Sequence, residues 1–401
     1  MRIRVFDYRA NLGGGARFAV ELCASLKELY PFLKFEIVSF GKALARYASL
    51  VEQYNLQIPV VAAPPTSICQ RIIADSDSEG VRYAIGSLRG WGIEAPHEVV
   101  EDCDVAWFPW VHGHLLPQRA PEKVIASFHD VIPFQFPEIF SRIPTRVFVC
   151  EGRNVVDWME SGAPVILTSH ATVDALQDVL GVKCKNPNII RLSGDHRVLG
   201  PELSATVPFE SKLKDPFLLY PANLTGHKNH EMLFRGVSLW GKKVPLLLTG
   251  EGTQALFKKF SWGRVRKLRS LALTLGFSLG DSLIPLGYVS TSNYERVLRS
   301  SWALIVPTLA EGGGSFPILE ALRVGVPVLC SDIPVVREQI DFFGGDVIWF
   351  DPYSANDIGE KLDILFSDYE RYRRRSEEQI PNLTRRSWLD VARDYARIIG
   401  I

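Results

Sequence analysis

The stretch ALIVPTLAEGGGSFPILEAL, residues 303–322, decides the fold. It opens with a continuous apolar run at residues 303–306, which is typical of a strand buried on both faces. Three glycines follow, and then Ser315 and Pro317 suit the N-cap and the first turn of a helix. A strand that runs through a short loop into a helix is the repeating unit of parallel sheets. The stretch therefore predicts an α/β fold.

The same stretch carries a candidate binding site. Glycines 312–314 expose backbone amides in front of a helix N-terminus, where an anion is stabilised. Glu311 precedes this loop and Glu320 lies a turn into the helix. Carboxylates on both sides of the loop can accept hydrogen bonds from hydroxyl groups that flank a bound phosphate. This layout suits a sugar nucleotide, and a purely structural glycine turn is the alternative.

Similar apolar runs alternate with amphipathic stretches along the chain, which predicts two doubly wound units with parallel strands and crossover helices. Helical spacing occurs at residues 17–29 and 388–399, and Ser292 with Glu295 predicts a capping box. The predicted strands are residues 3–7, 35–39, 105–108, 124–128, 165–168 and 189–192 in the first half, and 217–220, 246–249, 283–285, 303–306, 326–330 and 347–350 in the second.

The domain boundary is predicted in residues 194–216, which are rich in Gly, Pro and Ser and lack periodicity. We expect a first Rossmann-like domain over residues 1–200, a second over residues 201–380, and a terminal helix within residues 381–401.

Composition excludes several classes of protein. The chain has 401 residues, 47% of them hydrophobic, so it can bury more than one core. Its 45 basic and 45 acidic residues cancel, which argues against a nucleic-acid-binding protein. Apolar runs are shorter than the roughly 20 residues of a membrane span, and residues 1–7 favour a strand over a secretory signal. Six scattered cysteines favour reduced thiols, so we expect a soluble cytosolic chain.

Loops after other predicted strands are candidate sites, because ligands of open α/β sheets bind beyond the carboxyl ends of the strands. Gly13, Gly14 and Gly15 follow the first strand and favour the binding of a phosphate group. The alternative is that they form only a tight turn. This loop is not G-x-G-x-x-G, and residues 35–39 end without an acidic residue, which disfavours a dinucleotide oxidoreductase.

Histidine and lysine side chains follow three more strands. His129 can act as an acid or base, or polarise a bound group; the alternative is a histidine that bonds a local carbonyl. Trp110, His112 and His114 suit the face of a sugar, or else pack internally. Lys228 lies near a predicted helix start, where a cation is favoured beside a bound anion; a solvated surface lysine is the alternative.

With these motifs the chain resembles glycosyltransferase family 4, a retaining family with the GT-B fold of two facing Rossmann-like domains, and in particular its bacterial mannosyltransferase-like members. The resemblance covers nearly the whole chain. It rests on GG-x-x-R at 13–17, H-D-h-x-P at 129–133, K-N at 228–229, G-x-G at 250–252, G-x-V at 287–289, the paired glutamates 311 and 320, and a C-terminal crossover helix that begins at Trp388.

Two positions depart from the family pattern. Eight residues separate Glu311 from Glu320 here, where the family usually has seven, and the extra residue reshapes the loop. The family's usual phosphate-binding arginine, five positions before the lysine, falls on Asn223. Phosphate neutralisation then depends more heavily on Lys228, on loop amides and on helix dipoles. Both departures bear on the identity of the donor.

The resemblance implies a retaining sugar transfer from a nucleotide diphosphate sugar, with His129, Glu311 and Lys228 as the catalytic residues. Lys228 would hold the diphosphate, Glu311 would bind hydroxyls of the donor sugar, and His129 would contact that sugar. Glu320 would bind the ribose. The further donor-binding residues that it implies are Gly14, Gly15, Asn223, Gly250, Tyr288, Val289, Gly313, Gly314 and Ser315, and the acceptor-binding residues are Trp110, His112 and Arg17.

The implied mechanism is a front-face transfer, because the motifs present no evident nucleophile. The two D-x-D triplets, at 75–77 and 102–104, do not follow the carboxyl ends of strands, so we expect no metal and no cofactor. The first domain would bind the acceptor and the second the nucleotide sugar, and the C-terminal helix would return to the first domain. The best guess for the donor is GDP-mannose, with a UDP-hexose nearly as well supported, and the acceptor would be a saccharide or lipid-linked saccharide in polysaccharide or glycolipid assembly.

Other functions stay open at this point. The same fold would serve a non-catalytic sugar-nucleotide-binding subunit, a UDP-hexose-dependent transferase, or a sugar-nucleotide epimerase or phosphorylase. Basic residues at 258–269, interleaved with aromatic ones, can dock on anionic lipid, although a solvated helix face is the alternative. We therefore expect weak peripheral membrane contact at most, in the cytoplasm or at the cytoplasmic face of the inner membrane.

Overall fold

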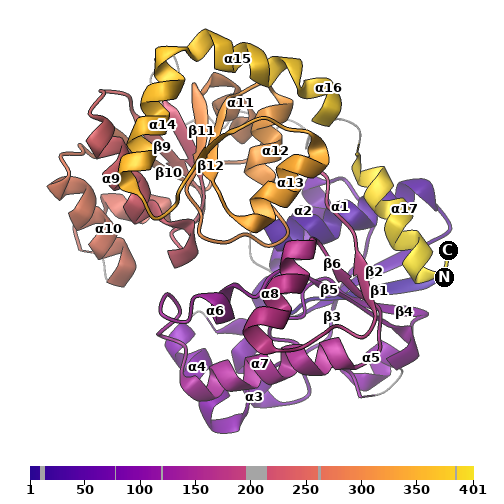
Figure 1. Ribbon diagram of the computed structural model, residues 1–401. Helices are drawn as coiled ribbons and strands as arrows, with labels where there is room; N and C mark the ends of the chain where they lie inside the picture. The colour runs from indigo at the N-terminus through magenta and orange to yellow at the C-terminus, as the bar shows by residue number, and fades with distance from the viewer. Residues whose placement is uncertain (10–13, 77, 119–120, 196–214, 261–262, 384–385) are drawn as a thin grey trace. The chain divides into compact units, whose positions relative to one another are not determined.

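The computed structural model describes all residues except 10–13, 77, 119–120, 196–214, 261–262 and 384–385 (Figure 1). The chain divides into two compact units. Unit 1 comprises Met1–Arg197 together with Ser387–Ile401, and unit 2 comprises Val198–Arg386. Among the described residues, no helix is both long enough and apolar enough to cross a membrane.

Unit 1 is built on a parallel sheet of seven strands in the order β3-β2-β1-β4-β5-β6-β7. The strands are β1 (Arg2–Phe6), β2 (Lys34–Ser39), β3 (Val60–Ala62), β4 (Val105–Phe108), β5 (Val124–Phe128), β6 (Val165–Leu167) and β7 (Pro187–Ile189). The helices are α1 (Gly14–Leu29), α2 (Gly41–Gln53), α3 (Ile68–Asp75), α4 (Glu79–Arg89), α5 (His97–Glu101), α6 (Ile132–Gln135), α7 (Thr145–Glu160) and α8 (His170–Leu180).

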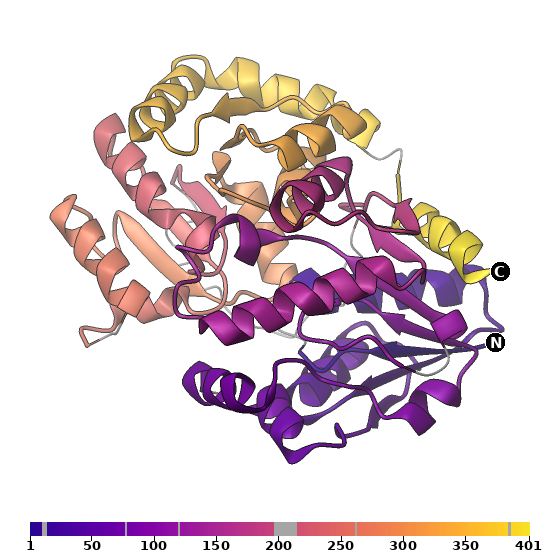
Figure 2. The ribbon, with the colours of Figure 1, turned by 60° about the horizontal axis from the view of Figure 1, so that its bottom comes forward.

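A last helix, α17 (Trp388–Ile399), belongs to unit 1 and lies beside α1 (Figures 1 and 2). It begins with a capping box, in which the Ser387 side chain accepts from the Asp390 amide and the Asp390 carboxylate accepts from the Ser387 amide at 2.8 Å. Its buried face presents Tyr395, whose hydroxyl lies 3.0 Å from Ser127 Oγ of β5. This apolar face holds the end of the chain on the unit 1 sheet.

Unit 2 is built on a parallel sheet of six strands in the order β10-β9-β8-β11-β12-β13. The strands are β8 (Leu218–Pro221), β9 (Leu246–Thr249), β10 (Leu283–Gly287), β11 (Ala303–Val306), β12 (Val328–Ser331) and β13 (Ile348–Phe350). The helices are α9 (His230–Trp240), α10 (Gly263–Thr274), α11 (Thr291–Ser300), α12 (Phe316–Arg323), α13 (Pro334–Phe343), α14 (Ala355–Ser367), α15 (Tyr369–Glu378) and α16 (Ile380–Leu383).

Two glycines allow α9 and α14 to approach closely on unit 2. A Cβ atom on Gly236 would lie 2.5 Å from Cγ2 of Ile358, and one on Gly359 would lie 3.3 Å from the Gly236 carbonyl oxygen. Either side chain would force the helices apart. The close approach helps to seal the core around β8 and β11, two strands at the centre of the sheet.

The predicted α/β class and eleven of the twelve predicted strands are confirmed, four of them with the predicted bounds, while the predicted strand 189–192 overlaps β7 only at Ile189. One strand, β3, was not predicted. The first helix begins at Gly14 instead of Arg17, so the glycine loop extends into the helix. The predicted capping box at Ser292 is wrong, because α11 begins at Thr291 with Ser290 at the N-cap position.

Candidate functional site

Strand order places one switch point in each sheet. In unit 1 the order reverses between β1 and β4, and in unit 2 between β8 and β11. Ligands of doubly wound sheets bind beyond the carboxyl ends of the two strands on either side of such a point, because the crossover connections leave in opposite directions there. The loops that follow these four strands are therefore the first places to examine.

In unit 2, the loops after β8 and β11 bring Lys228 and Glu311 together. Lys228 Nζ lies 2.7 and 2.8 Å from the two carboxylate oxygens of Glu311. Their side chains are only 20% and 10% exposed, so solvent screens this ion pair weakly. The two residues are 83 positions apart in sequence, and the topology of the sheet makes them neighbours.

The conformation and the side chain of Asn229 fix the turn that carries Lys228. The turn Gly226–Lys228 is a single 3₁₀ turn, and Asn229 follows with a φ of 54°, in the left-handed region that asparagine tolerates. The side-chain amide of Asn229 donates to the carbonyl oxygens of Pro307 at 3.0 Å and Pro352 at 2.7 Å. The loop after β8 is thereby tied to the loop after β11, which keeps Lys228 beside Glu311.

The glycine loop before α12 is shaped by Gln339. Gly313 and Gly314 have φ values of 75° and 112°, and a Cβ on Gly314 would lie 2.6 Å from Cδ of Gln339. Gln339 Oε1 accepts from the Ser315 amide at 2.9 Å, and its Nε2 donates to the Ser315 carbonyl at 3.3 Å. The Ser315 amide that was expected to bind phosphate is thus already engaged. Glu320 lies half-buried on α12.

Other predicted donor-binding residues hold the neighbouring loops in shape. Asn223 Oδ1 accepts from the Thr225 amide at 3.2 Å and from its hydroxyl at 2.6 Å, which closes an Asx turn. Gly250 has a φ of 130°, its amide donates to Gly287 at 2.7 Å, and a Cβ on it would lie 2.6 Å from Ala222 backbone.

Tyr288 and Val289 follow β10, at the edge of the sheet. Tyr288 is 52% exposed, and Val289 packs against the apolar core of unit 2. The sheet order separates these two residues from the switch point between β8 and β11.

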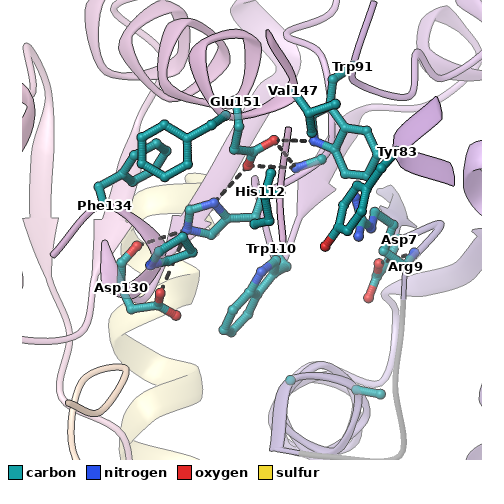
Figure 3. Close-up of a pocket in the computed structure, with 16 residues that line it drawn as sticks. Asp7, Arg9, Tyr83, Trp91, Trp110, His112, Asp130, Phe134, Val147 and Glu151 are labelled. Atoms are coloured by element: carbon teal, nitrogen blue, oxygen red, sulfur yellow. Dashed lines mark hydrogen bonds and ion pairs between the residues drawn. The ribbon is translucent and has the colours of Figure 1, made fainter. Parts of the chain in front are cut away.

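In unit 1, a cavity of about 280 Å³ lies at the switch point between β1 and β4 (Figure 3). Its walls come from the loops after β1, β4 and β5, from the start of α1, and from α4 and α7. The lining residues are Asp7, Arg9, Gly15, Ala16, Tyr83, Trp91, Trp110, His112, Gly113, Asp130, Pro133, Phe134, Ile143, Val147, Phe148 and Glu151. Aromatic rings and charged side chains therefore share one hollow.

Glu151 is the centre of the polar wall of this cavity. It accepts hydrogen bonds from His112 Nδ1 at 2.8 Å, from Trp91 Nε1 at 2.8 Å and from the Gly113 amide at 3.0 Å (Figure 3). His112 Nε2 lies 2.8 Å from the Asp130 carbonyl oxygen, so both ring nitrogens of His112 face acceptors. An imidazole that donates from both nitrogens is protonated.

The protonation of these groups follows from the same contacts. Burial alone would lower the pKa of His112, but the hydrogen bond and charge of Glu151 outweigh burial and raise this pKa to about 9. Burial would raise the pKa of Glu151, but the hydrogen bond and charge of His112 lower it below its usual range. The wall therefore contains a buried imidazolium–carboxylate pair at neutral pH.

A second cation lies across this cavity. The guanidinium carbon of Arg9 lies 4.7 Å from the centre of the Trp91 ring, in a cation–π arrangement. Gly113 has a φ of 75°, and a Cβ on it would lie 2.6 Å from Cδ of Arg9. A residue with a side chain at position 113 would displace Arg9 from the ring.

His129 lies next to the cavity but is not among its lining residues. Its neighbour Trp110 does line the cavity. His129 Nε2 donates to the Pro109 carbonyl at 2.9 Å, and the His129 ring stacks on Trp110 with centres 4.7 Å apart. Burial lowers its pKa to about 4, so it is neutral at physiological pH, with an unprotonated Nδ1. The hypothesis of a bond to a carbonyl is correct for Nε2, and the catalytic role of His129 stays a prediction.

The other predicted residues of unit 1 divide between the cavity and its surroundings. His112 and Gly15 line the cavity, while Gly14 is exposed at the start of α1. Arg17 instead interacts with Tyr54, close to Glu21. His114 was expected at the rim, but it is fully buried, and its Nε2 accepts from the Tyr8 amide at 3.0 Å.

Sequence reasoning missed the residues that do most to shape the cavity, namely Arg9, Tyr83, Trp91 and Glu151. Asp7 and Arg9 directly follow β1, so the rule that directed attention to the glycine loop would also have selected them. Glu151 lies within α7, where the local pattern of the helix carries no sign of a site.

The two D-x-D triplets have structural roles where they are described. Asp102 pairs with Arg2 and, at 3.0 Å, with Arg4, and Asp104 accepts from the Arg2 amide at 2.7 Å. Asp75 accepts from the Lys42 amide, and Asp77 lies outside the described residues. Over the described part of the chain, no group of three or more His, Cys, Asp or Glu side chains could hold a metal ion.

Comparison with known sequences finds a family model that resembles unit 2. Residues 206–380 match the family model described as glycosyl transferases group 1. The mannosyltransferase WbdA of Escherichia coli is 27% identical over 278 residues, which is 68% of this chain and 33% of WbdA. The O-antigen chain mannosyltransferase RfbU of Salmonella typhimurium is 22% identical over 57% of this chain and 56% of RfbU. The chain thus spans about a third of the length of WbdA and about half that of RfbU.

Solved structures are similar over the whole chain. HepE of Anabaena, in complex with UDP and glucose, has a TM-score of 0.69 at 15% identity, and covers 100% of this chain and 99% of its own. WaaG, a glycosyltransferase involved in lipopolysaccharide biosynthesis, has a TM-score of 0.66 at 14% identity and covers 99% of both chains. This chain therefore has the GT-B fold, and its residues 206–380 are similar to the glycosyl transferases group 1 model.

Proposed function

We propose that the chain is a retaining glycosyltransferase of family 4 that moves a hexose from a nucleotide diphosphate sugar to a saccharide or lipid-linked saccharide acceptor. The observation that carries the proposal is the ion pair of Lys228 and Glu311 at the switch point of unit 2, within the segment that matches the group 1 model. A mostly buried ammonium group is suited to a departing diphosphate, and a mostly buried carboxylate is suited to sugar hydroxyls.

In the proposed reaction, Lys228 binds the diphosphate and stabilises its charge as it leaves. Glu311, released from Lys228 as the diphosphate binds, accepts hydrogen bonds from hydroxyls of the donor sugar. The bond between the anomeric carbon and the diphosphate oxygen breaks, and the acceptor oxygen forms its bond on the same face. The acceptor proton passes to the leaving phosphate oxygen, so the reaction uses no metal and no other cofactor.

The remaining donor contacts follow the loops of unit 2. The amides of Gly313 and Gly314 and the N-termini of α9 and α12 would face the phosphates, and Glu320 would bind the ribose. Because Gln339 occupies the Ser315 amide, Ser315 would contribute only after that bond opens.

Unit 1 would bind the acceptor in its cavity. Flat aromatic walls from Trp110 and Trp91 suit the apolar face of a sugar ring, and the carboxylates of Asp7 and Asp130 suit its hydroxyls. In this assignment, His112 keeps Glu151 charged and orders the loop after β4, and it touches the acceptor from the cavity wall.

Mannose is the sugar that the similar proteins favour. WbdA and RfbU are mannosyltransferases by name, which supports GDP-mannose. The HepE complexes contain UDP and UDP-glucose, which supports a UDP-hexose as the second candidate. The reaction would take place in the cytoplasm, with at most weak contact between the basic helix α10 and a membrane surface.

Transfer assays test the proposal directly. Purified chain is incubated with GDP-mannose or UDP-glucose and a panel of mannosides and lipid-linked saccharides, and the released nucleotide and the anomeric configuration of the product are measured. We expect acceptor-dependent release with retention, and a loss of about 10²–10³-fold in kcat for Lys228→Ala. The matched control is Lys242→Ala, which removes an exposed ion pair with Asp363 in the same unit. Unchanged transfer by Lys228→Ala would overturn the assignment, and binding without transfer to any acceptor would favour a non-catalytic subunit.

A further inference from the structure

A second cation lies beside the Lys228 turn and belongs to a different helix. Arg264 is in the first turn of α10 (Gly263–Thr274), and its Nη2 donates to the carbonyl oxygen of Gly226 at 3.4 Å. Gly226 is the first residue of the turn that ends at Lys228. In Figure 1, α10 lies beside α9, which begins directly after that turn. The guanidinium group is therefore held against the loop that follows β8.

The charge of this guanidinium is not balanced by a carboxylate in contact with it. Among the described residues, no acidic side chain lies within ion-pair distance of Arg264. The charge of Glu231 affects the pKa of Arg264 only from a longer distance. Glu231 itself pairs with Arg235 at 3.0 Å. The Nε–H group of Arg264 is buried without a hydrogen-bond partner, although a buried donor of this kind is normally satisfied. A guanidinium group with no carboxylate in contact and an unsatisfied Nε–H donor is suited to bind an anion.

The neutral groups around Arg264 leave its positive charge unbalanced. Burial, together with the smaller effect of the charges of Lys228 and Arg264, lowers the pKa of His227 and that of His230 to about 3 each. Both imidazoles are therefore neutral at physiological pH, and neither can offset the two cations. Asn223, on the same loop, is closed into a turn with Thr225 and brings no charge.

Charge balance then assigns different tasks to the two cations. Lys228 and Glu311 sum to zero, so this pair alone offers no net attraction to a diphosphate. Arg264 adds one positive charge in a planar group that can donate two parallel hydrogen bonds to phosphate oxygens. Binding of an anion there would also satisfy the orphaned Nε–H group.

We propose that Arg264 is a second phosphate-binding residue of unit 2, which together with Lys228 binds the diphosphate of the nucleotide sugar. This assignment rests on the proposed function, because it takes the ligand to be a nucleoside diphosphate sugar. The alternative is a structural arginine that only holds the Gly226 carbonyl.

Calorimetric titration of the full chain separates these roles. UDP and GDP are first titrated into the wild-type chain, and the tighter of the two is then compared with its own nucleoside. The variants are Arg264→Gln, Arg264→Lys and, as a matched control on the same helix, Arg266→Gln, whose side chain is exposed. Thermal unfolding of each variant verifies that unit 2 remains folded.

We expect Arg264→Gln to weaken diphosphate binding by roughly 10- to 100-fold, the effect of losing a charged hydrogen bond, while nucleoside binding changes by less than about twofold. Arg264→Lys should keep part of the affinity, and Arg266→Gln should match the wild type. Diphosphate binding by Arg264→Gln within about twofold of wild type would overturn the proposal. An equal loss for diphosphate and nucleoside would also overturn it, in favour of the structural role. A wild-type chain that binds neither UDP nor GDP would instead overturn the proposed function, and this assignment with it.

Discussion

The two units use the same sheet topology for sites that differ in charge. At the switch point of unit 1, Glu151 is matched by His112 within an aromatic cavity, so this ion pair carries no net charge. At the switch point of unit 2, Lys228 and Glu311 also cancel, but Arg264, which contacts the Gly226 carbonyl of the Lys228 turn, has no carboxylate partner among the described residues. The fold provides the place for a ligand, and under the proposed function a few charged side chains determine whether that ligand is a neutral sugar or an anion.

This contrast also explains why the chain as a whole can be neutral. Its 45 basic and 45 acidic residues leave no net field to attract a phosphate from a distance. An excess charge at one switch point is enough to attract an anion locally, because solvent screens partly buried groups less than those on the surface.

The largest expected effect comes from the carboxylate of unit 2. Glu311→Gln should lower kcat for transfer by about 10²–10³-fold, because the amide no longer balances Lys228 or accepts from the donor sugar as strongly. The same variant should bind UDP or GDP at least as tightly as wild type, since Lys228 is freed for the phosphates. Steady-state assays and calorimetry measure the two effects. Glu338→Gln on α13 of the same unit is the control, and equal losses in both measurements would contradict the assigned role.

Replacement of the unit 1 carboxylate Glu151 should mainly lower stability. Glu151→Gln leaves a buried imidazolium without its partner, which should lower the free energy of unfolding by about 3–5 kcal/mol. Chemical denaturation measures this, with the exposed Glu138→Gln of the same unit as the control. A loss below about 1 kcal/mol would show that the pair is not a buried ion pair.

The same pair predicts an alkaline weakness of unit 1. The folded pKa of His112 is about 9, above the unfolded value of about 6.5. The stability that protonated His112 contributes is therefore fully present below about pH 6.5 and is lost as the pH rises through 9. Between these values, the advantage of wild type over His112→Gln should shrink by roughly 3 kcal/mol. Denaturation curves of both proteins at several pH values give the difference, and an advantage that grows with pH would contradict the assignment.

The smallest effect concerns the glycine loop of unit 2. Gly314→Ala should destabilise unit 2 by about 2–3 kcal/mol, because the new methyl group meets Gln339 and the backbone is left-handed. Gly276→Ala is the matched control: its φ is 86°, but nothing lies within 4 Å of a Cβ there. The control should lose only about 1–2 kcal/mol, from backbone strain alone. Equal losses in thermal unfolding would show that Gln339 does not shape the loop.

The sequence was sufficient to predict most of the sheets, because continuous apolar runs such as 105–108 and 246–249 have sharp polar boundaries. It did not reveal β3, a three-residue edge strand whose side chains are mostly exposed, so no buried pattern marks it. The start of α1 was predicted late because glycine, which disfavours helix interiors, occupies its first turn.

Site residues were predictable only where they lie in loops after strands. Lys228 and Glu311 stand in such loops, and the strand order explains their contact. Glu151 and Trp91 lie outside such loops. Only tertiary packing brings them next to His112 and Arg9. The engagement of the Ser315 amide by Gln339, 24 residues further along the chain, likewise has no local signature.

One measurement tests the contrast between the two units most directly: calorimetric titration of UDP and GDP into wild type, Lys228→Ala and Trp110→Ala. We predict that wild type binds one of the two nucleotides, that Lys228→Ala weakens this binding by roughly 10- to 100-fold, and that Trp110→Ala leaves it within about twofold while transfer to the acceptor falls. Wild-type affinity in Lys228→Ala, or a comparable loss in Trp110→Ala, would contradict the assignment of the diphosphate to unit 2.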